Sequence, residues 1–231
     1  MLDNSIFGVV MKIGIIGVTG RMGQELVQLI SFENFAGGIS TQTTPEDLEA
    51  VVKNSDVVID FSRPAATLQV LPVVEKYRIP FVSGTTGFIP DEFNMFLKAS
   101  KNIPILYASN FSLGVQFVAT VLRQCSRVFP DFDFSVIERH HIHKKDAPSG
   151  TALFLAKQVQ QKQQIVSIRA GNICGEHACS FTGNDEEITI EHKAFNRTIF
   201  AKGAIACAEW LIGKSAKLYT AEDFLQDRLH G

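Results

Sequence analysis

The sequence predicts an α/β protein in which a doubly wound parallel sheet is joined to a second domain of mixed α+β structure. Three observations support this fold class. Short apolar runs alternate with helix-like segments over residues 11–111, and a glycine-rich turn follows the first run. After residue 111 the alternation ends, and strand-like runs with apolar residues at every second position take its place.

Composition narrows the classes of protein to be considered. The chain has 231 residues, 45% of them hydrophobic, so it can bury one large core or two small ones. Its 22 basic and 24 acidic side chains argue against a nucleic-acid surface, and no apolar run approaches the roughly 18 residues that cross a bilayer. The N-terminus lacks the basic region of a signal peptide, and four cysteines suggest no disulfide framework, so we expect a cytoplasmic protein.

The first apolar run, residues 11–16, is typical of a strand buried in a parallel sheet. It continues into Gly17-Val18-Thr19-Gly20-Arg21-Met22-Gly23 and then into a helix. A strand, a glycine turn and a helix open a Rossmann-type dinucleotide-binding unit, although the spacing here is GxxGxxG instead of GxGxxG. The methionine at position 11 leaves open whether residues 1–10 belong to the native start.

The end of the second strand, residues 35–40, bears on the choice of cofactor. An NAD site usually has Asp or Glu about twenty residues beyond the glycine turn, where it binds the ribose hydroxyls. This chain has Ser40-Thr41-Gln42-Thr43-Thr44 instead. These hydroxyls either accept a 2′-phosphate or cap a helix that begins near Pro45, so both NADH and NADPH stay open.

Further strands are expected at residues 56–61, 79–83 and 103–108, with helices at residues 64–77 and 90–100 between them. In a doubly wound sheet, ligands bind beyond the carboxyl ends of the strands. We therefore expect a cofactor groove lined by the residues that fall at those ends, which are Arg21, Phe61, Gly84, Thr85, Thr86, Ala108, Ser109, Asn110 and Phe111.

One segment of the second domain carries most of the expected chemistry. A helix at residues 115–128 and a strand from Phe134 lead into Glu138-Arg139-His140-His141-Ile142-His143-Lys144-Lys145-Asp146-Ala147-Pro148-Ser149-Gly150-Thr151-Ala152-Leu153. Pro148 and Ser149 set the start of a helix expected over residues 151–161. The helix start suits a carboxylate or phosphate, and the segment adds a lysine charge and a histidine that can transfer a proton near neutral pH.

These residues allow two other interpretations, a metal site and a solvated basic loop. His140, His141 and His143 at a strand end would not all point one way, and Cys174-Gly175-Glu176-His177-Ala178-Cys179 lacks the paired spacing of a zinc site, so we predict no metal. A solvated basic loop without chemistry is the stronger alternative. The direct connection between the histidines and a glycine-opened helix start argues against it.

The remaining chain completes the expected domain organisation. Strands are expected at residues 187–194 and 198–202, and helices at residues 203–212 and 221–229 return to the first domain. The first domain, which carries the dinucleotide-binding turn, would then comprise residues 1–111 and 204–231, and the second domain, which carries the expected anion site and proton donor, would comprise residues 112–203.

Over nearly its whole length the sequence resembles the dihydrodipicolinate reductase (4-hydroxy-tetrahydrodipicolinate reductase) family. The 138–153 segment is the most specific match. The others are the glycine turn, Asp60-Phe61-Ser62-Arg63-Pro64, Gly84-Thr85-Thr86-Gly87, Asn110-Phe111-Ser112-Leu113-Gly114-Val115, Arg169-Ala170-Gly171-Asn172-Ile173, Gly175-Glu176-His177 and Phe200-Ala201-Lys202-Gly203-Ala204.

The resemblance implies an NADH- or NADPH-dependent reduction of a small cyclic dicarboxylate, 4-hydroxy-tetrahydrodipicolinate, to tetrahydrodipicolinate in lysine biosynthesis through diaminopimelate. It implies that His140 is the general acid, with Lys144 as its catalytic partner. Substrate carboxylate binding would fall to His141, Lys144, Gly150, Thr151 and Thr86. Cofactor contacts would come from Gly17, Thr19, Gly20, Arg21, Met22, Phe61, Gly84, Thr85, Thr86, Ala108, Asn110 and Phe111.

The resemblance also implies a homotetramer built through sheet contacts of the second domain, although the region near residues 166–171 is shorter than in familiar members. Two competing functions are another two-domain nicotinamide dehydrogenase, acting on an amino acid or an aldehyde, and a non-catalytic dinucleotide sensor. The segment from His140 to Thr151 argues against both, and the charge balance offers no DNA-binding module to a sensor.

Overall fold

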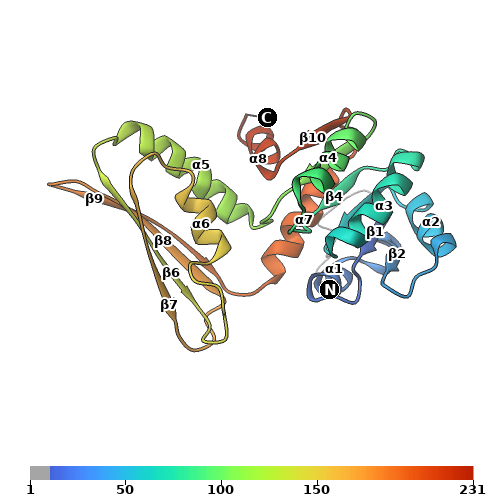
Figure 1. Cartoon of the computed structure of the whole chain (residues 1–231), viewed down its shortest axis with the longest axis horizontal. Coiled ribbons are helices and arrows are strands. Elements are labelled where there is room, and N and C mark those ends of the chain that lie inside the picture. Colours follow the sequence, from blue (N-terminus) through green and yellow to red (C-terminus); the bar gives the residue numbers. More distant parts are fainter. Residues whose placement is uncertain (1–10, 231) are drawn as a thin grey trace, which may run out of the picture. The chain divides into compact units, whose positions relative to one another are not determined.

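The computed structural model describes residues 11–230, which divide into two compact units (Figure 1). Unit 1 holds the chain up to Phe111 and again from Phe200, and unit 2 holds residues 112–199. The sequence places the second boundary at residue 204. Whether residues 1–10 belong to the native start is a question outside the described residues, and the binding roles expected for the two units stay predictions.

Unit 1 is built on a six-stranded sheet in the order β10-β5-β4-β3-β1-β2, with every neighbouring pair parallel. Its strands are β1 (Ile13–Ile16), β2 (Phe35–Ile39), β3 (Val57–Asp60), β4 (Phe81–Ser83), β5 (Pro104–Tyr107) and β10 (Lys217–Tyr219). Its helices are α1 (Arg21–Leu29), α2 (Pro45–Lys53), α3 (Pro64–Tyr77), α4 (Pro90–Ala99), α7 (Thr198–Leu211) and α8 (Ala221–His230), and the first two residues of α7 fall in unit 2. β2 lies on one side of β1, and β3, β4 and β5 follow in order on the other side. This order confirms the doubly wound fold class.

The apolar runs of unit 1 form a core that is covered on both faces of the sheet. Strands β1, β3 and β4 are buried at every position. Val58, Phe81 and Ile105 of the sheet pack in one cluster with Val74 of α3 and Phe96 of α4. Strands covered on both faces read as continuous apolar runs in the sequence, which is why they were predictable.

Unit 2 is a four-stranded sheet in the order β7-β6-β8-β9, and its two helices lie on one face (Figure 1). Its elements are α5 (Leu113–Val128), β6 (Asp133–His140), α6 (Gly150–Ala156), β7 (Gln163–Arg169), β8 (Gly175–Thr182) and β9 (Glu187–Ala194). β7 is parallel to β6, whereas β8 is antiparallel to both β6 and β9. Phe134 and Val136 of β6 point at the helices and Ile137 points away, so one face of the sheet is covered and the other exposed.

Some expected boundaries are wrong. The helix expected over residues 151–161 ends at Ala156, because the chain turns at Lys157 and Gln158. Residues 198–202, expected as a strand, begin α7, in which buried residues recur at helical spacing from Ala201 onward. The strand expected at residues 187–194 is β9, and strands β7, β8 and β10 are additional to those expected.

Among residues 11–230, no helix combines the length and the apolar character that crossing a membrane requires.

Candidate active site

The strands of unit 1 end in register. Ile16 of β1 pairs with Ile39 of β2 and with Asp60 of β3, and Ser83 of β4 pairs with Asp60 and with Tyr107 of β5. The turns after these strands therefore lie along one edge of the sheet, where doubly wound sheets bind ligands. This edge carries every residue predicted to contact the cofactor: Gly17, Thr19, Gly20, Arg21, Met22, Phe61, Gly84, Thr85, Thr86, Ala108, Asn110 and Phe111.

The turn between β1 and α1 fits a pyrophosphate. Gly17 has a φ of +81°, and a Cβ on Gly23 would lie 2.3 Å from the Gly17 carbonyl oxygen, so only glycine lets α1 pack this closely on the turn. The helix follows Gly20 without a side-chain cap and has no acidic residue in its first turn. Its first amide groups therefore suit an anion, which supports a dinucleotide at this site.

Asp60, at the end of β3, is a buried carboxylate that joins the turn after β3 to the turn after β4. It accepts hydrogen bonds from the hydroxyls of Thr67 at 2.6 Å, Ser83 at 2.9 Å and Thr85 at 3.0 Å, and from that of Ser62. Burial raises the pKa of Asp60, and these hydrogen bonds oppose the rise. Because the Thr85 hydroxyl is used within the protein, we expect Thr85 to contact a cofactor through its backbone.

Aromatic packing holds the neighbouring turns together. The rings of Phe61 and Phe111 meet edge to face, with centroids 5.4 Å apart. A Cβ on Gly84 would lie only 2.2 Å from a ring carbon of Phe61, so glycine is needed for the turn after β4 to pack against this ring. The turns after β3, β4 and β5 are therefore held against one another.

The turn after β2 contains hydroxyls and no carboxylate over residues 40–44. The Ser40 hydroxyl accepts from the Gln42 amide at 3.2 Å, and the Thr43 hydroxyl accepts from the Ser40 amide at 2.9 Å. Thr44 caps α2 by accepting from the Asp47 amide at 3.1 Å. Helix capping is thus confirmed for Thr44, whereas Thr41 is exposed.

In unit 2, His140 lies at the end of β6 with its side chain on the covered face of the sheet. It is 7% exposed, and its Nδ1 atom is hydrogen-bonded to the Oε2 atom of Glu138, on the same face of the strand. The ring of His177 in β8 meets the His140 ring edge to face at 5.2 Å. Burial lowers the pKa of His140, and the hydrogen bond and charge of Glu138 oppose this change.

Glu138 is fully buried and pairs with Arg169 at the end of β7. Arg169 Nη1 lies 3.0 Å from Oε2 and Nη2 lies 2.8 Å from Oε1, so the pair is bidentate. Burial acts to raise the pKa of Glu138, but hydrogen bonds from Arg169, Ser167 and His140 outweigh it and lower the value to about 2. Glu138 is therefore an ionised carboxylate beneath the histidine.

The start of α6 continues from this carboxylate. The Ser149 amide donates to Glu138 Oε1 at 3.2 Å, and the Ser149 hydroxyl caps α6 by accepting from the Ala152 amide. A Cβ on Gly150 would meet nothing within 4 Å, so a ligand could approach the backbone there. The predicted anion site is thus connected to the predicted proton donor through one side chain, that of Glu138.

Lys144 lies in the loop between β6 and α6, with its Nζ atom 2.8 Å from Asp146 Oδ1. This hydrogen bond is the main cause of the lowered pKa of Asp146, and the Gly150 amide adds a smaller effect in the same direction. Two groups predicted to bind a substrate carboxylate therefore already hold a carboxylate of the protein. The rings of His141 and His143 have centroids 6.3 Å apart.

Glu138, His140 and His177 also offer metal-ligating atoms within 4.8 Å of one another. A cation there would compete with Arg169, which already occupies both oxygens of Glu138. Two hydrogen bonds to a guanidinium and one to an imidazole satisfy this carboxylate without a metal. The donor set does not fit a resident cation.

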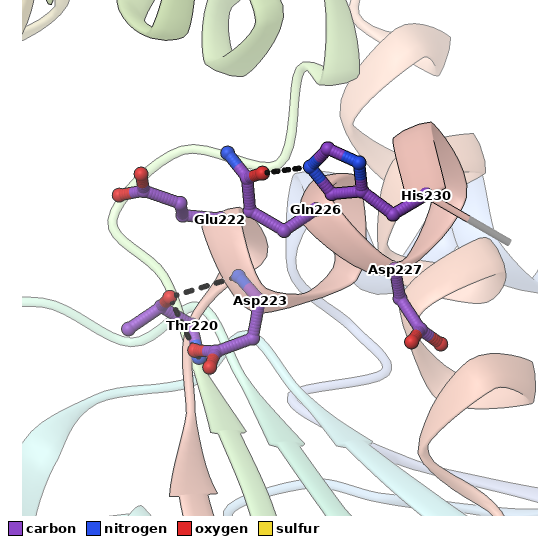
Figure 2. Close-up of a pocket in the computed structure, with 6 residues that line it drawn as sticks. All are labelled: Thr220, Glu222, Asp223, Gln226, Asp227 and His230. Carbon is purple, nitrogen blue, oxygen red and sulfur yellow. Dashed lines mark hydrogen bonds between the residues drawn. The ribbon is translucent and has the colours of Figure 1, made fainter.

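A separate hollow in unit 1 lies beside α8 and is lined by Thr220, Glu222, Asp223, Gln226, Asp227 and His230 (Figure 2). Its polar groups are already hydrogen-bonded within the protein, and Asp227 accepts from Trp210 and Lys214. Figure 2 shows the bonds that the lining residues make to one another. The Thr220 amide and hydroxyl donate to Asp223, and Gln226 is paired with His230. None of these residues is among those predicted for catalysis or binding.

Glu138, Arg169 and His177 are functional candidates for which the sequence alone predicts no role. Alternation along β6 puts Glu138 and His140 on one face, and this signal was present in the sequence. Arg169 and His177 reach them only because His140 pairs with Arg169 and Glu138 pairs with His177 across the sheet. That register could not be read without strands β7 and β8.

Comparison with known proteins gives consistent matches along the chain. Residues 11–111 match the model of the dihydrodipicolinate reductase N-terminus, and residues 114–225 match the model of its C-terminus. The 4-hydroxy-tetrahydrodipicolinate reductase of Rickettsia bellii (strain OSU 85-389) is 36% identical over 242 residues, covering 96% of this chain and 97% of that protein. The enzyme of the same name from Campylobacter jejuni subsp. jejuni serotype O:6 is 36% identical, covering 93% and 98%.

Solved structures share the fold. A dipicolinate-bound dihydrodipicolinate reductase from Paenisporosarcina sp. TG-14 matches with a TM-score of 0.78 and 21% identity, over 92% of this chain and 98% of that one. A DAP dehydrogenase of C. glutamicum in complex with DAP matches with a TM-score of 0.59 and 11% identity, over 93% of each chain. At these identities the likeness extends to the fold alone.

Proposed function

The chain belongs to the dihydrodipicolinate reductase family, and we propose how its own residues reduce 4-hydroxy-tetrahydrodipicolinate to tetrahydrodipicolinate. A nicotinamide cofactor supplies the hydride. The observation that carries the proposal is that a buried, carboxylate-paired His140, Lys144 and the start of α6 come from one segment of unit 2.

His140 is the general acid. Replacing the substrate hydroxyl by hydride consumes one hydride and one proton and releases water, so a group near the ring must deliver a proton. Nδ1 of His140 is engaged by Glu138, which leaves Nε2 to transfer it. Lys144 supports this step by stabilising negative charge on the substrate.

One substrate carboxylate binds to Lys144, His141 and the amides of Gly150 and Thr151. The dipicolinate bound to the Paenisporosarcina relative is a cyclic dicarboxylate of the same kind. In this chain the carboxylate of Asp146 lies against Lys144, so a ligand carboxylate would replace it. Thr86, in the turn after β4, would contact the cofactor.

The dinucleotide binds along the carboxyl edge of the unit 1 sheet, with its pyrophosphate at Gly17, Gly20 and the start of α1. We expect both NADH and NADPH to serve. Residues 40–44 carry no acidic side chain to repel a 2′-phosphate, and they carry no Lys or Arg to require one.

The assembly proposed is a cytoplasmic homotetramer formed through the exposed face of the unit 2 sheet. Ile137 pairs with Val166 across β6 and β7, and Ile168 follows on the same face. These side chains are 44%, 45% and 40% exposed in the single chain. An apolar patch on neighbouring strands suits burial against a second copy. Sedimentation velocity of wild type and Ile137→Glu tests the tetramer, because a charge in this patch should make the protein sediment as smaller oligomers or monomers.

The function is tested by oxidation of NADH and of NADPH, in parallel, with substrate generated enzymatically. Substrate-dependent oxidation supports the proposal, and the ratio of the two rates gives the cofactor preference. Folded protein that binds a dinucleotide but oxidises neither with this substrate would favour a sensor or a different substrate.

A further inference from the structure

We propose that Glu138 and Arg169 are positioning residues for the reduction, and that their ion pair holds the His140 imidazole with Nδ1–H toward the carboxylate and Nε2 toward the substrate. This inference rests on the proposed role of His140 as general acid. We assign neither residue a contact with the substrate or the cofactor. Both act through the histidine and through the loop that follows it.

The bonds made by Glu138 fix the direction of the proton. Its Oε1 atom accepts from Arg169 Nη2 and from the Ser149 amide, and its Oε2 atom accepts from Arg169 Nη1 and from His140. An ionised carboxylate can only accept, so His140 must donate from Nδ1. The neutral imidazole then carries its lone pair on Nε2, where a proton is taken up and delivered.

The surroundings of Nε2 support this direction. A Cβ on Gly175 of β8 would lie 3.1 Å from Nε2 and 3.4 Å from Cδ2 of His140, so glycine keeps that side of the ring uncrowded. The carboxylate therefore lies against one ring nitrogen, and the other is bordered by a residue without a side chain. This asymmetry is the one that a proton donor requires.

Titratable side chains face His140 from strands β6, β7 and β8 and from the loop that follows β6. Burial has the largest effect on His140 and disfavours the imidazolium. Lys144 of the loop and Arg169 of β7 also disfavour it, whereas Glu138 of β6 favours it. His177 of β8 is itself buried, and its pKa is lowered to about 4, so it adds little charge at neutral pH. Glu138 is thus the group that keeps the pKa of the buried histidine from falling further.

Arg169 extends the same arrangement to the carboxylate-binding loop. Its Nη2 atom also donates to the backbone carbonyl of Asp146, while Glu138 receives the Ser149 amide. Both ends of the segment from Asp146 to Ser149 are therefore tied to the ion pair that holds His140. Apolar residues of similar size often stabilise a fold as much as a buried ion pair does, so stability alone does not explain the pair of Glu138 and Arg169.

Steady-state kinetics of Glu138→Gln across pH test the inference. The active form carries a protonated His140, so activity falls as pH rises through its pKa. Removing the Glu138 charge lowers that pKa, and the falling limb of the kcat/KM profile should move to lower pH. We expect kcat at pH 7.5 to drop about 100-fold, with KM for the substrate within about threefold, because a misplaced acid affects the chemical step.

Arg169→Met provides an independent variant. Arg169 opposes protonation of His140, so its loss should move the same limb to higher pH, in the direction opposite to Glu138→Gln. Glu186→Gln removes the same charge at an exposed site of unit 2 and should leave the profile unchanged. Circular dichroism and NADH affinity check that each variant is folded. Where Glu138→Gln does not fold, Glu138→Asp retains the charge and should lower kcat while leaving the limb in place.

The inference would be overturned if the falling limb of the kcat/KM profile lay at the wild-type pH in both folded variants, Glu138→Gln and Arg169→Met. It would also be overturned if the limb moved in the same direction in the two variants. His140→Gln separates this from a failure of the proposed function. If His140→Gln is inactive while Glu138→Gln keeps the wild-type kcat and pH profile, only the positioning role is rejected. A fully active His140→Gln rejects the general acid itself.

Discussion

Lys144 Nζ lies 2.8 Å from Asp146 Oδ1, within the loop that leads from β6 to α6. Lys144, which we propose to bind a substrate carboxylate, is therefore paired with a carboxylate of the protein itself. The Asp146 side chain is 57% exposed and the Lys144 side chain 23%, so the pair is partly solvated and can be exchanged at small cost.

Asp146→Asn should consequently bind dicarboxylates more tightly. An ion pair of this exposure is worth up to about 1 kcal/mol, so the Kd for pyridine-2,6-dicarboxylate should fall by about two- to fivefold. Isothermal titration of wild type and variant measures this, with Lys144→Met as the variant expected to lose binding. Weaker binding by Asp146→Asn would mean that the carboxylate supports the loop instead of competing with the ligand.

The buried carboxylate of Asp60 leads to a prediction for unit 1. Asp60→Ala removes the acceptor shared by the hydroxyls of Thr67, Ser83 and Thr85, each of which would then be buried without its partner. Leaving buried polar groups unsatisfied costs about 1–3 kcal/mol each. We expect a lower Tm and weaker NADH binding, because the turns after β3 and β4 lose their common anchor. Thermal unfolding with and without NADH measures both, and an unchanged Tm would refute the anchoring role.

Glu209 of α7 predicts how stability depends on pH. Its Oε1 atom is buried without a hydrogen-bond partner among the described residues, and burial raises the pKa of Glu209 to about 7, opposed only by Arg228. The folded pKa thus lies above the unfolded value near 4.5, so stability is lost as pH rises between these values. Glu209→Gln should remove that loss.

The Tm advantage of Glu209→Gln over wild type should accordingly be larger at pH 8 than at pH 5. Differential scanning calorimetry at the two pH values tests this. A difference in Tm that stays constant between them would show that Glu209 does not titrate as its burial predicts.

Sequence pattern was sufficient for most of unit 1. Its strands are buried on both faces, so runs such as residues 57–59 are wholly apolar, and glycine and proline separate them from the helices. Unit 2 was harder to predict. β8 places Gly175, His177 and Cys179 on its covered face, so polar and small residues obscure its alternation. The five residues from Thr198 mimic a strand because three of them are apolar, but Ala201, Ala204 and Ala208 continue a helical stripe.

The candidate site divides in the same way. His140, Lys144 and Gly150 lie in one short segment, so local sequence was enough to associate them. Glu138 and Arg169 are separated by 31 residues and meet only through the pairing of β6 with β7, a strand that was not predicted. The acceptors that orient a catalytic side chain depend on sheet register, and a single sequence does not specify that register.

The role of His140 as general acid is tested by steady-state oxidation of NADH and NADPH by wild type and His140→Gln, with substrate supplied at saturation and dinucleotide binding measured separately. General acid catalysis contributes about 10²- to 10⁴-fold, so kcat of the variant should fall by that factor while its dinucleotide Kd stays within about twofold of wild type. A His140→Gln variant that keeps the wild-type kcat would contradict the account, because the proton would then come from another group.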